Sequence, residues 1–263
     1  MVLPLELEEQ VLRALLLFTG LRVTPICGIR WGDVSFSATT FSSGLECPGS
    51  IRATSGASRE VTALPGWLTI EEQQRLVAAC REWAKPPAGM RHTPMPSGGR
   101  MSVQTVCLGW HWLPYRYSRT ADDIDGAPVK PFPGWVAELG RRALADAYTD
   151  PAEAASYRPD VALINFYDEQ ARMGMHADKD ERSAAPVVSL SLGSACVFRF
   201  GNAQTRGKPW HDITLESGDL FVFGGEARLA YHGVTKTIPG TERPEIGLPS
   251  GRLNITLRES GRT

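Results

Sequence analysis

The chain has 263 residues and a formal net charge of −1, so the protein as a whole has no excess of positive charge that would attract polyanions. This length allows one large domain or two small ones, and a substantial core without covalent staples. The five cysteines are scattered and contain no CxxC pair, which argues against a disulfide framework and a four-cysteine zinc site and favours a reducing, cytoplasmic location.

The first 58 residues are expected to form a poorly ordered leader. Their apolar run at 11–18 is too short to span a membrane, contains Arg13, and follows acidic residues where a secretory signal would be basic. The Ser-, Thr- and Gly-rich stretch that follows has no sustained period. We expect no export signal and no membrane partner, and place the functional domain at 59–263.

Two helices are predicted. Thr69 and Glu72 have the spacing of a capping box, which predicts a helix over 71–84 with one apolar face formed by Leu76, Val77, Cys80, Trp83 and Ala84. A second helix is predicted over 134–148, with an apolar stripe at Trp135, Leu139 and Leu144. Both helices are interpreted as scaffold.

Beyond Asp160 the sequence becomes a series of short strand-like runs separated by Gly, Pro, Asn and Asp. They cover residues 161–167, 186–193, 195–200, 211–216, 219–224, 228–234 and 252–258. Their spacing is typical of an all-β sandwich or barrel. The prediction is an α+β fold with a jelly-roll core, a double-stranded β-helix, over about 160–260 and the helices on one face.

The segment MHADKDE at 175–181 suggests a metal site. If it is extended, His176 and Asp178 point the same way and can reach one ion. His232 is the downstream histidine close to a strand end, since His211 has a polar, turn-like context. Two histidines and one carboxylate form the facial triad of non-haem Fe(II) oxygenases, although the same ligands can hold zinc.

The run RLNITLR at 252–258 has a strict period of two. It places Arg252, Asn254, Thr256 and Arg258 on one strand face and three apolar residues on the other. On a solvent face the polar set would be unremarkable. On an interior face, two guanidinium groups would require anions, and a dicarboxylate beside the iron would satisfy them.

Together these motifs resemble the signature of the AlkB family of Fe(II)- and 2-oxoglutarate-dependent dioxygenases, which repair alkylated nucleic acid. The resemblance covers about residues 60–260. It implies that iron is bound by His176, Asp178 and His232. It also implies that 2-oxoglutarate is held by Asn165, Tyr167, Arg252, Asn254 and Arg258, with Arg252 at the distal carboxylate.

Residues 90–120 resemble the nucleotide-recognition lid of that family. The resemblance assigns Trp110 to stacking on the base, Tyr115 and Tyr117 to the base or backbone, and Asp180 to the damaged base, while Trp112 is expected in the core. Candidate phosphate contacts are Arg91, Arg100, Arg116, Arg119, Arg206 and Lys208.

The implied activity is oxidative demethylation of bases such as 1-methyladenine and 3-methylcytosine in DNA or RNA, in alkylation repair. It consumes 2-oxoglutarate and O2 and yields succinate, CO2 and formaldehyde. Asp180 would favour the cationic lesions by Coulomb attraction. We expect a monomer that prefers single-stranded DNA. A 2-oxoglutarate-dependent hydroxylase of a protein or small molecule, and a jelly-roll binding protein without catalysis, are the alternatives.

Overall fold

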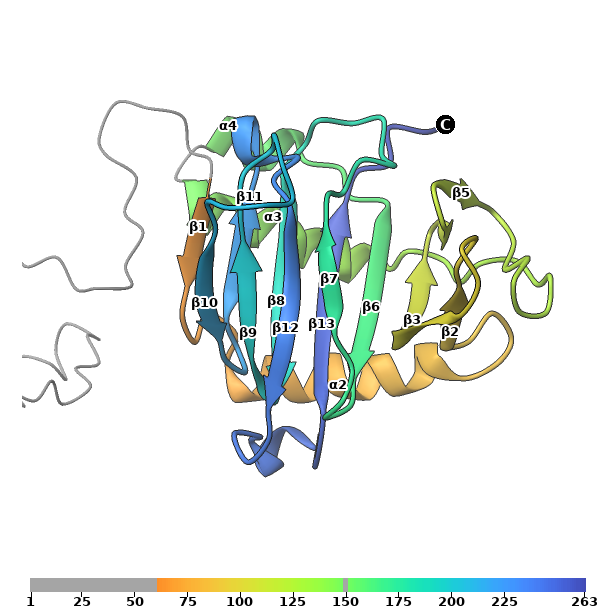
Figure 1. Cartoon of the computed structure of the whole chain (residues 1–263), viewed down its shortest axis with the longest axis horizontal. Coiled ribbons are helices and arrows are strands. Elements are labelled where there is room, and N and C mark those ends of the chain that lie inside the picture. The colour runs from red at the N-terminus through yellow and green to blue at the C-terminus, as the bar shows by residue number, and fades with distance from the viewer. Residues whose placement is uncertain (1–60, 149–150) are drawn as a thin grey trace, which may run out of the picture. The chain divides into compact units, whose positions relative to one another are not determined.

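The computed structural model describes residues 61–148 and 151–263, so the leader expected at 1–58 lies outside the described residues. Two antiparallel sheets face each other (Figure 1). The larger has the strand order β1 (Val61–Leu64), β11 (Leu220–Phe223), β8 (Val187–Gly193), β13 (Arg252–Arg258), β6 (Val161–Tyr167), β3 (Arg100–Leu108), β2 (Arg91–Pro94). The smaller is β10 (His211–Leu215), β9 (Ala195–Phe200), β12 (His232–Ile238), β7 (Met173–His176). This is the predicted jelly roll.

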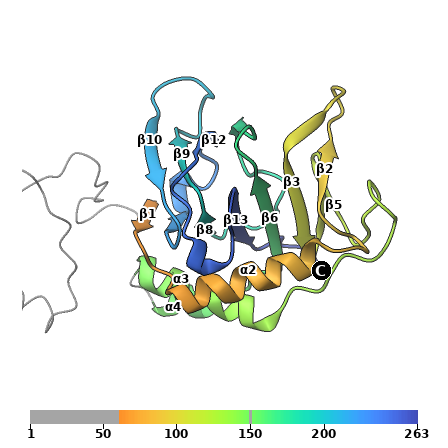
Figure 2. The same cartoon turned by 90° about the horizontal axis from the view of Figure 1, so that it is seen from below.

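The helices lie against the outer face of the large sheet (Figure 2). They are α2 (Ile70–Ala84), α3 (Gly134–Tyr148) and α4 (Pro151–Ser156), with short 3-10 turns η2 (Gly225–Ala227) and η3 (Pro244–Ile246) in loops. The capping box is confirmed, because the Thr69 hydroxyl accepts from the Glu72 amide and the Glu72 carboxylate accepts from the Thr69 amide. No helix in the described ranges has the length and apolar character needed to cross a membrane.

Helix α3 buries Leu144 of the predicted stripe, but the rest of its buried face differs from the prediction. Trp135 and Leu139 are only half-buried, and the deeply buried side chains of the face are Val136, Ala143, Leu144 and Tyr148. A Cβ atom on Gly140 would lie 3.1 Å from Leu257 Cδ1, so small residues set this close approach to β13. Trp135 instead stacks on Trp83 of α2 at 6.0 Å between ring centroids. The large aromatic residues therefore fill the space between the helices.

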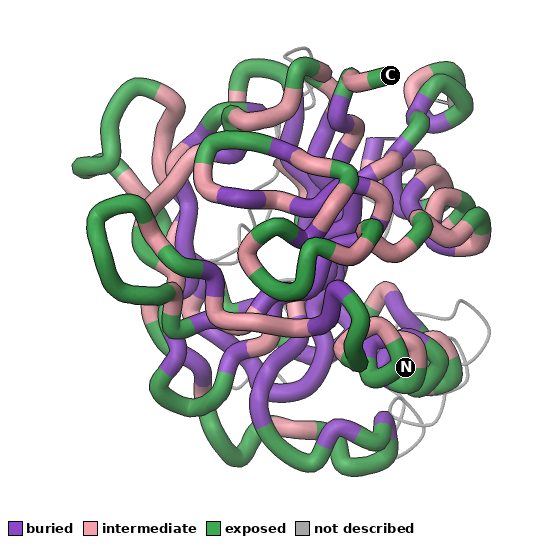
Figure 3. The backbone as a smooth tube through the Cα atoms, turned by 90° about the vertical axis from the view of Figure 1, so that its right-hand side faces the viewer, coloured by how far each residue is buried: buried purple, intermediate pink, exposed green. Residues whose placement is uncertain are grey.

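Strand β13 separates two apolar cores. Leu253, Ile255 and Leu257 pack into the core between the large sheet and the helices, where burying each side chain contributes roughly 1.5–3 kcal/mol. Phenylalanines from β9 and β11 dominate the second core, between the sheets. Figure 3 shows the buried stretches of the backbone gathered in the interior and the exposed ones in the outer loops. The polar face of β13 lies in the interior, which decides between the two alternatives that the sequence left open.

The predicted runs 161–167, 195–200 and 252–258 coincide with β6, β9 and β13. The run predicted at 228–234 is displaced, because η2 precedes it and β12 begins only at His232. His211 does not lie in a turn but begins β10. The sequence did not predict β1, β2, β3 or β7, nor the small hairpin of β4 (His111–Leu113) and β5 (Arg116–Ser118). Most of these strands have only three or four residues, too few to show an alternation of polar and apolar residues, and the nine-residue β3 ends in an apolar run without alternation.

Candidate metal centre and substrate cavity

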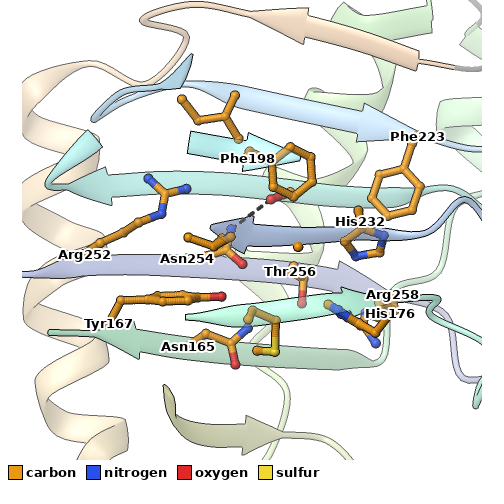
Figure 4. Close-up of a pocket in the computed structure, with 15 residues that line it drawn as sticks. Asn165, Tyr167, His176, Phe198, Phe223, His232, Arg252, Asn254, Thr256 and Arg258 are labelled. Atoms are coloured by element: carbon orange, nitrogen blue, oxygen red, sulfur yellow. Dashed lines mark hydrogen bonds between the residues drawn. The ribbon is translucent and has the colours of Figure 1, made fainter. Parts of the chain in front are cut away.

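Three side chains from two strands and one loop meet at one end of the interior. His176 ends β7, His232 begins β12, and the two are directly paired across the strands. Asp178 lies in the loop after β7, so it is not on an extended continuation of that strand. Each histidine Nε2 is 3.6 Å from an oxygen of the Asp178 carboxylate. Figure 4 shows the two imidazoles side by side, at 4.5 Å between ring centroids.

Backbone carbonyl groups fix both imidazoles in the orientation a metal ligand needs. Nδ1 of His176 lies 3.0 Å from the Gly174 oxygen, and Nδ1 of His232 lies 2.9 Å from the Ala230 oxygen. Since a carbonyl can only accept, both Nδ1 atoms carry the proton and both Nε2 lone pairs face Asp178. Burial and the neighbouring His176 lower the pKa of His232 to about 4, so this imidazole is neutral near pH 7.

Asp178 completes a site suited to a divalent cation. Burial alone would raise its pKa, but the Arg258 guanidinium and the two histidines hold that pKa well below its usual range. Arg258 Nη2 is 2.9 Å from Asp178 Oδ2, yet this buried oxygen accepts no hydrogen bond of acceptable geometry. A buried, ionised carboxylate with a free oxygen, facing two imidazole lone pairs, fits the donor set of the non-haem iron triad.

A narrow cavity runs from the triad between the sheets to Arg252, which lies at its far end (Figure 4). Arg252 is 1% exposed. Its Nη2 donates to the Ser191 hydroxyl at 2.8 Å and its Nη1 to the Ser194 carbonyl at 3.4 Å, while Nε has no partner. Across residues 61–148 and 151–263, no carboxylate forms an ion pair with this guanidinium. A buried cation without an anion fits a ligand carboxylate.

The other residues assigned to 2-oxoglutarate line the same cavity: Asn165, Tyr167, Asn254 and Arg258. The Asn165 side-chain oxygen accepts from Thr105 Oγ1 at 2.9 Å, and the Asn254 amide donates to Ser189 Oγ at 2.8 Å. Burial raises the pKa of Tyr167, so its hydroxyl remains a neutral donor. The structure thus brings together the five residues that the resemblance assigned to the co-substrate.

Arg258 also belongs to a buried ion-pair network that the sequence did not reveal. The Glu181 side chain is fully buried between two guanidinium groups, with Oε1 3.0 Å from Arg258 Nη1 and Oε2 3.1 Å from Arg228 Nη2. Burial and the Asp178 charge act to raise the pKa of Glu181, but Arg258, Tyr117 and Arg228 together lower it. The Tyr117 hydroxyl donates to the same carboxylate. These four residues lie far apart in the sequence and share no motif, so only the fold identifies the network.

A second cavity, of about 340 Å³, opens beside the triad, and its lining includes His176, Asp178 and Arg258. Its wall includes Trp112, whose indole Nε1 donates to Asp180 Oδ2 at 2.8 Å. Tyr115 lies at the turn of the β4–β5 hairpin, 68% exposed, with a φ of 68°. A volume of this size is in the range of small-ligand sites. Predicted residues Tyr115, Asp180 and Arg206 all line this cavity.

Trp110 and Tyr117 do not line this cavity. The Trp110 indole donates to Asp160 Oδ2 at 3.0 Å, and Arg119 covers its ring at 3.5 Å from the centroid. The preceding Gly109 has a φ of 78°, and a Cβ atom there would lie 1.9 Å from the Asp160 carbonyl oxygen. This turn directs Trp110 away from the cavity, whereas Trp112, expected in the core, forms part of its wall.

Three exposed cations surround the cavity: Arg172, Lys179 and Arg206. Within the described part of the chain, none of them forms an ion pair, and Arg206 lies over the Tyr231 ring at 5.6 Å. Two other candidate phosphate contacts are already paired with carboxylates. Arg91 is buried against Asp123, and Arg116 pairs with Asp122.

Comparison with known proteins agrees with this geometry. The family model described as the 2OG-Fe(II) oxygenase superfamily matches residues 60–258. The chain is 36% identical to the Escherichia coli alpha-ketoglutarate-dependent dioxygenase AlkB, over 64% of this chain and 76% of that protein. It is also 36% identical to the Caulobacter vibrioides AlkB homolog, over 74% of this chain and 86% of that protein.

Plant relatives match as well. The chain is 35% identical to the Arabidopsis thaliana DNA N(6)-methyladenine demethylase ALKBH1D, over 74% of this chain and 48% of that protein, so it spans about half the length of that relative. The solved structure of OsALKBH1 superimposes with a TM-score of 0.67 at 30% identity and covers 76% of this chain and 98% of that one. The chain belongs to the AlkB family within the 2OG-Fe(II) oxygenase superfamily.

Proposed function

We propose that this chain is an Fe(II)- and 2-oxoglutarate-dependent dioxygenase that oxidatively demethylates N-alkylated bases in nucleic acid, as an alkylation-repair enzyme. The observation that carries the proposal is the cavity of about 340 Å³ whose wall combines His176 and Asp178 with Trp112, Tyr115 and Asp180. A ligand in this cavity lies directly against the metal triad. The cavity therefore offers both the chemistry and a means of recognising a base.

The residues of the chain divide the work between two sites. His176, Asp178 and His232 would hold Fe(II), and Arg252 would bind the distal carboxylate of 2-oxoglutarate at the far end of the narrow cavity. Bound there, iron with 2-oxoglutarate and O2 supplies the oxidation of an N-methyl group, which leaves as formaldehyde while succinate and CO2 form. The protein positions both reactants, and its apolar second core excludes water.

The rim of the cavity supports nucleic acid rather than a protein or small molecule as the substrate. Trp112, Tyr115 and Tyr231 offer aromatic faces for bases, and stacking is worth roughly 1–3 kcal/mol per base. The unpaired cations at the rim suit phosphate groups. A base must leave its stack to reach the triad, which is least costly in a single strand or at a lesion that cannot pair. We therefore expect single-stranded DNA to be preferred. We expect a monomer, since one chain supplies the whole site, and a cytoplasmic location, since the scattered cysteines favour a reducing compartment.

Asp180 supports a cationic lesion. Bases methylated at N1 of adenine or N3 of cytosine carry positive charge, and the second oxygen of Asp180 has no hydrogen-bond donor among the described residues. Neutral N6-methyladenine in DNA is the second candidate, because ALKBH1D and the related ALKBH1C of Arabidopsis, 31% identical, are named as demethylases of that base. The two candidate bases differ in charge, so the Asp180 carboxylate should favour the cationic base over neutral N6-methyladenine.

A lesion panel tests the proposal. Purified protein with Fe(II) and 2-oxoglutarate is given oligonucleotides containing 1-methyladenine, 3-methylcytosine or N6-methyladenine, each as single and double strands of DNA and RNA, and formaldehyde is measured. We expect the cationic lesions in single-stranded DNA to react fastest. Greater activity on N6-methyladenine would select the second candidate, and substrate-independent succinate formation without formaldehyde from any oligonucleotide would overturn a nucleic-acid substrate.

A further inference from the structure

A buried polar cluster lies behind the wall of the substrate cavity and takes no part in binding the metal or 2-oxoglutarate. It consists of Arg91 of β2, Cys107 of β3, His111 of β4 and Asp123 of the loop after β5. His111 Nε2 is 2.5 Å from Asp123 Oδ1, and Arg91 Nε is 3.1 Å from Asp123 Oδ2. The three charged side chains are each at least nine-tenths buried.

The cluster is held together by charge. Burial would raise the pKa of the Cys107 thiol, but the His111 contact and the Arg91 charge lower it. Burial would lower the pKa of His111, but its contacts with Cys107 and Asp123 raise it. Arg91 Nη2 also lies 3.1 Å from His111 Nε2, and Arg91 Nη1 donates to Cys107 Sγ at 3.6 Å, so each of the four groups has a polar partner within the cluster. Such a network is rigid when every member has a partner.

Arg91 connects this cluster to the cavity wall through the backbone. Its Nη2 donates to the Trp112 carbonyl at 2.6 Å, and its Nη1 donates to the Thr105 carbonyl at 2.9 Å. The Trp112 amide in turn donates to Cys107 Sγ at 3.4 Å. Both backbone groups of Trp112 are therefore fixed by the cluster on the edge of β4 that faces away from β5.

The side chain of Trp112 carries this constraint to the recognition site. Its indole forms part of the cavity wall and donates to Asp180 at 2.8 Å. β4 contains only three residues and pairs with β5 alone. The cluster holds the Trp112 backbone on the side of β4 that does not pair with β5. A displacement of the indole would move Asp180 as well, because the two share a hydrogen bond.

We propose that Arg91 is a positioning residue for base recognition: by holding the backbone of Trp112, it fixes the Trp112–Asp180 pair that selects a methylated base. This proposal rests on the proposed function, since it names the residue that sets the selectivity of that same cavity. It assigns Arg91 to neither phosphate nor metal. The expected consequence of loosening it is a loss of selectivity, with the 2-oxoglutarate site left intact.

Binding measurements on the full chain test this role. A single-stranded DNA oligonucleotide with one 1-methyladenine and its unmethylated twin are titrated by fluorescence anisotropy, with Mn(II) and 2-oxoglutarate present. Arg91→Lys keeps the charge but lacks the fork that reaches both carbonyl groups. We expect it to reduce the preference for the methylated strand by about tenfold, and to leave 2-oxoglutarate affinity within about twofold of wild type. Arg141→Lys, on the surface of α3, is the matched control.

A double-mutant cycle separates positioning from a general structural role. Trp112→Phe removes the indole donor, so Arg91→Lys should cause no further loss of preference in a Trp112→Phe background. A further tenfold loss in that background would overturn the proposal. If Arg91→Lys does not fold, Asp123→Asn leaves Arg91 without its carboxylate and should lower the preference in the same direction; unchanged preference there would overturn it.

The two proposals fail differently. If the wild-type protein does not distinguish the methylated strand from its twin, the proposed function is overturned and the role of Arg91 with it. If the wild-type protein distinguishes them and Arg91→Lys is equally selective, the proposal for Arg91 alone is overturned.

Discussion

The hydroxyl of Tyr117 donates to the buried carboxylate of Glu181, which joins the β4–β5 hairpin to the ion pairs beside the metal triad. Tyr117→Phe removes this one hydrogen bond to a charged group, and we expect a loss of about 2 kcal/mol in the free energy of unfolding. Urea denaturation measures it. Tyr157→Phe is the control, because its hydroxyl donates to the neutral Leu257 carbonyl and its removal should cost about 1 kcal/mol. Equal losses of unfolding free energy in the two variants would contradict a hydrogen bond from Tyr117 to a charged carboxylate.

Removing the charge of Arg252 and of Arg258 should have different effects on the free energy of unfolding. Arg252 has no carboxylate partner among the described residues, so Arg252→Met should leave the unfolding free energy without ligand within about 1 kcal/mol of wild type. It should weaken 2-oxoglutarate binding by about a hundredfold, since that ligand supplies the missing anion. Calorimetric titration of 2-oxoglutarate measures this loss, and undiminished affinity would remove Arg252 from the co-substrate site.

Arg258→Met leaves two buried carboxylates, those of Asp178 and Glu181, without their shared cation. Breaking a buried ion pair in this way costs about 3–5 kcal/mol. Urea denaturation of Arg258→Met beside Arg252→Met shows the contrast directly. A stability loss no greater for Arg258→Met than for Arg252→Met would show that the network around Glu181 does not depend on this guanidinium.

Tyr115 occupies a backbone conformation that a tyrosine rarely adopts. It follows Pro114 in the two-residue turn of the hairpin, where its φ of 68° favours glycine or asparagine. Tyr115→Asn should therefore raise the unfolding free energy by about 1 kcal/mol, and should weaken binding of a methylated oligonucleotide, because the exposed ring is lost. Thermal denaturation and anisotropy measure the two effects.

The control for this substitution is Ile124→Asn, an exposed apolar residue outside the left-handed region. It should give no comparable gain in stability. If Tyr115→Asn is no more stable than wild type, or binds the oligonucleotide equally well, the ring is not held in a strained turn for recognition.

Acidification should destabilise the metal-free protein through His232. Its pKa is about 4 in the folded state against 6.5 ordinarily, so between these values the unfolded chain binds more protons and stability falls as the pH falls. The full difference corresponds to about 3 kcal/mol. Melting temperatures of wild type and His232→Asn, both metal-free, measure it between pH 7 and pH 4. If the melting temperature of His232→Asn depends on pH as that of wild type does, His232 is not the cause of the acid destabilisation.

The structure brings together in one interior the residues that the sequence and the family resemblance proposed for the metal and the co-substrate. The strict period of two along β13 predicted which side chains share a face, but whether that face lies in the interior was decided only by the fold. The two-residue spacing of His176 and Asp178 was also informative, although Asp178 lies beyond β7 rather than on it. A regular period along a strand therefore lets the sequence predict which side chains lie on the same face.

The lid could not be predicted in the same way. Trp110 and Trp112 are two residues apart, and alternation alone would give them one environment. Gly109 turns the chain just before β4, so Trp110 binds Asp160 while Trp112 reaches Asp180. The partners of Glu181 and Arg91 come from distant strands and loops. Such contacts depend on tertiary packing, which no local pattern encodes.

The most direct test of the central claim is formaldehyde release from a single-stranded DNA oligonucleotide containing 1-methyladenine, with Fe(II), 2-oxoglutarate and O2, by wild type and by Asp178→Ala. We predict one formaldehyde and one succinate for each methyl group removed by wild type, and loss of both products in Asp178→Ala, because the triad loses its carboxylate. Formaldehyde release at the wild-type rate by Asp178→Ala, or none from wild type, would contradict the account.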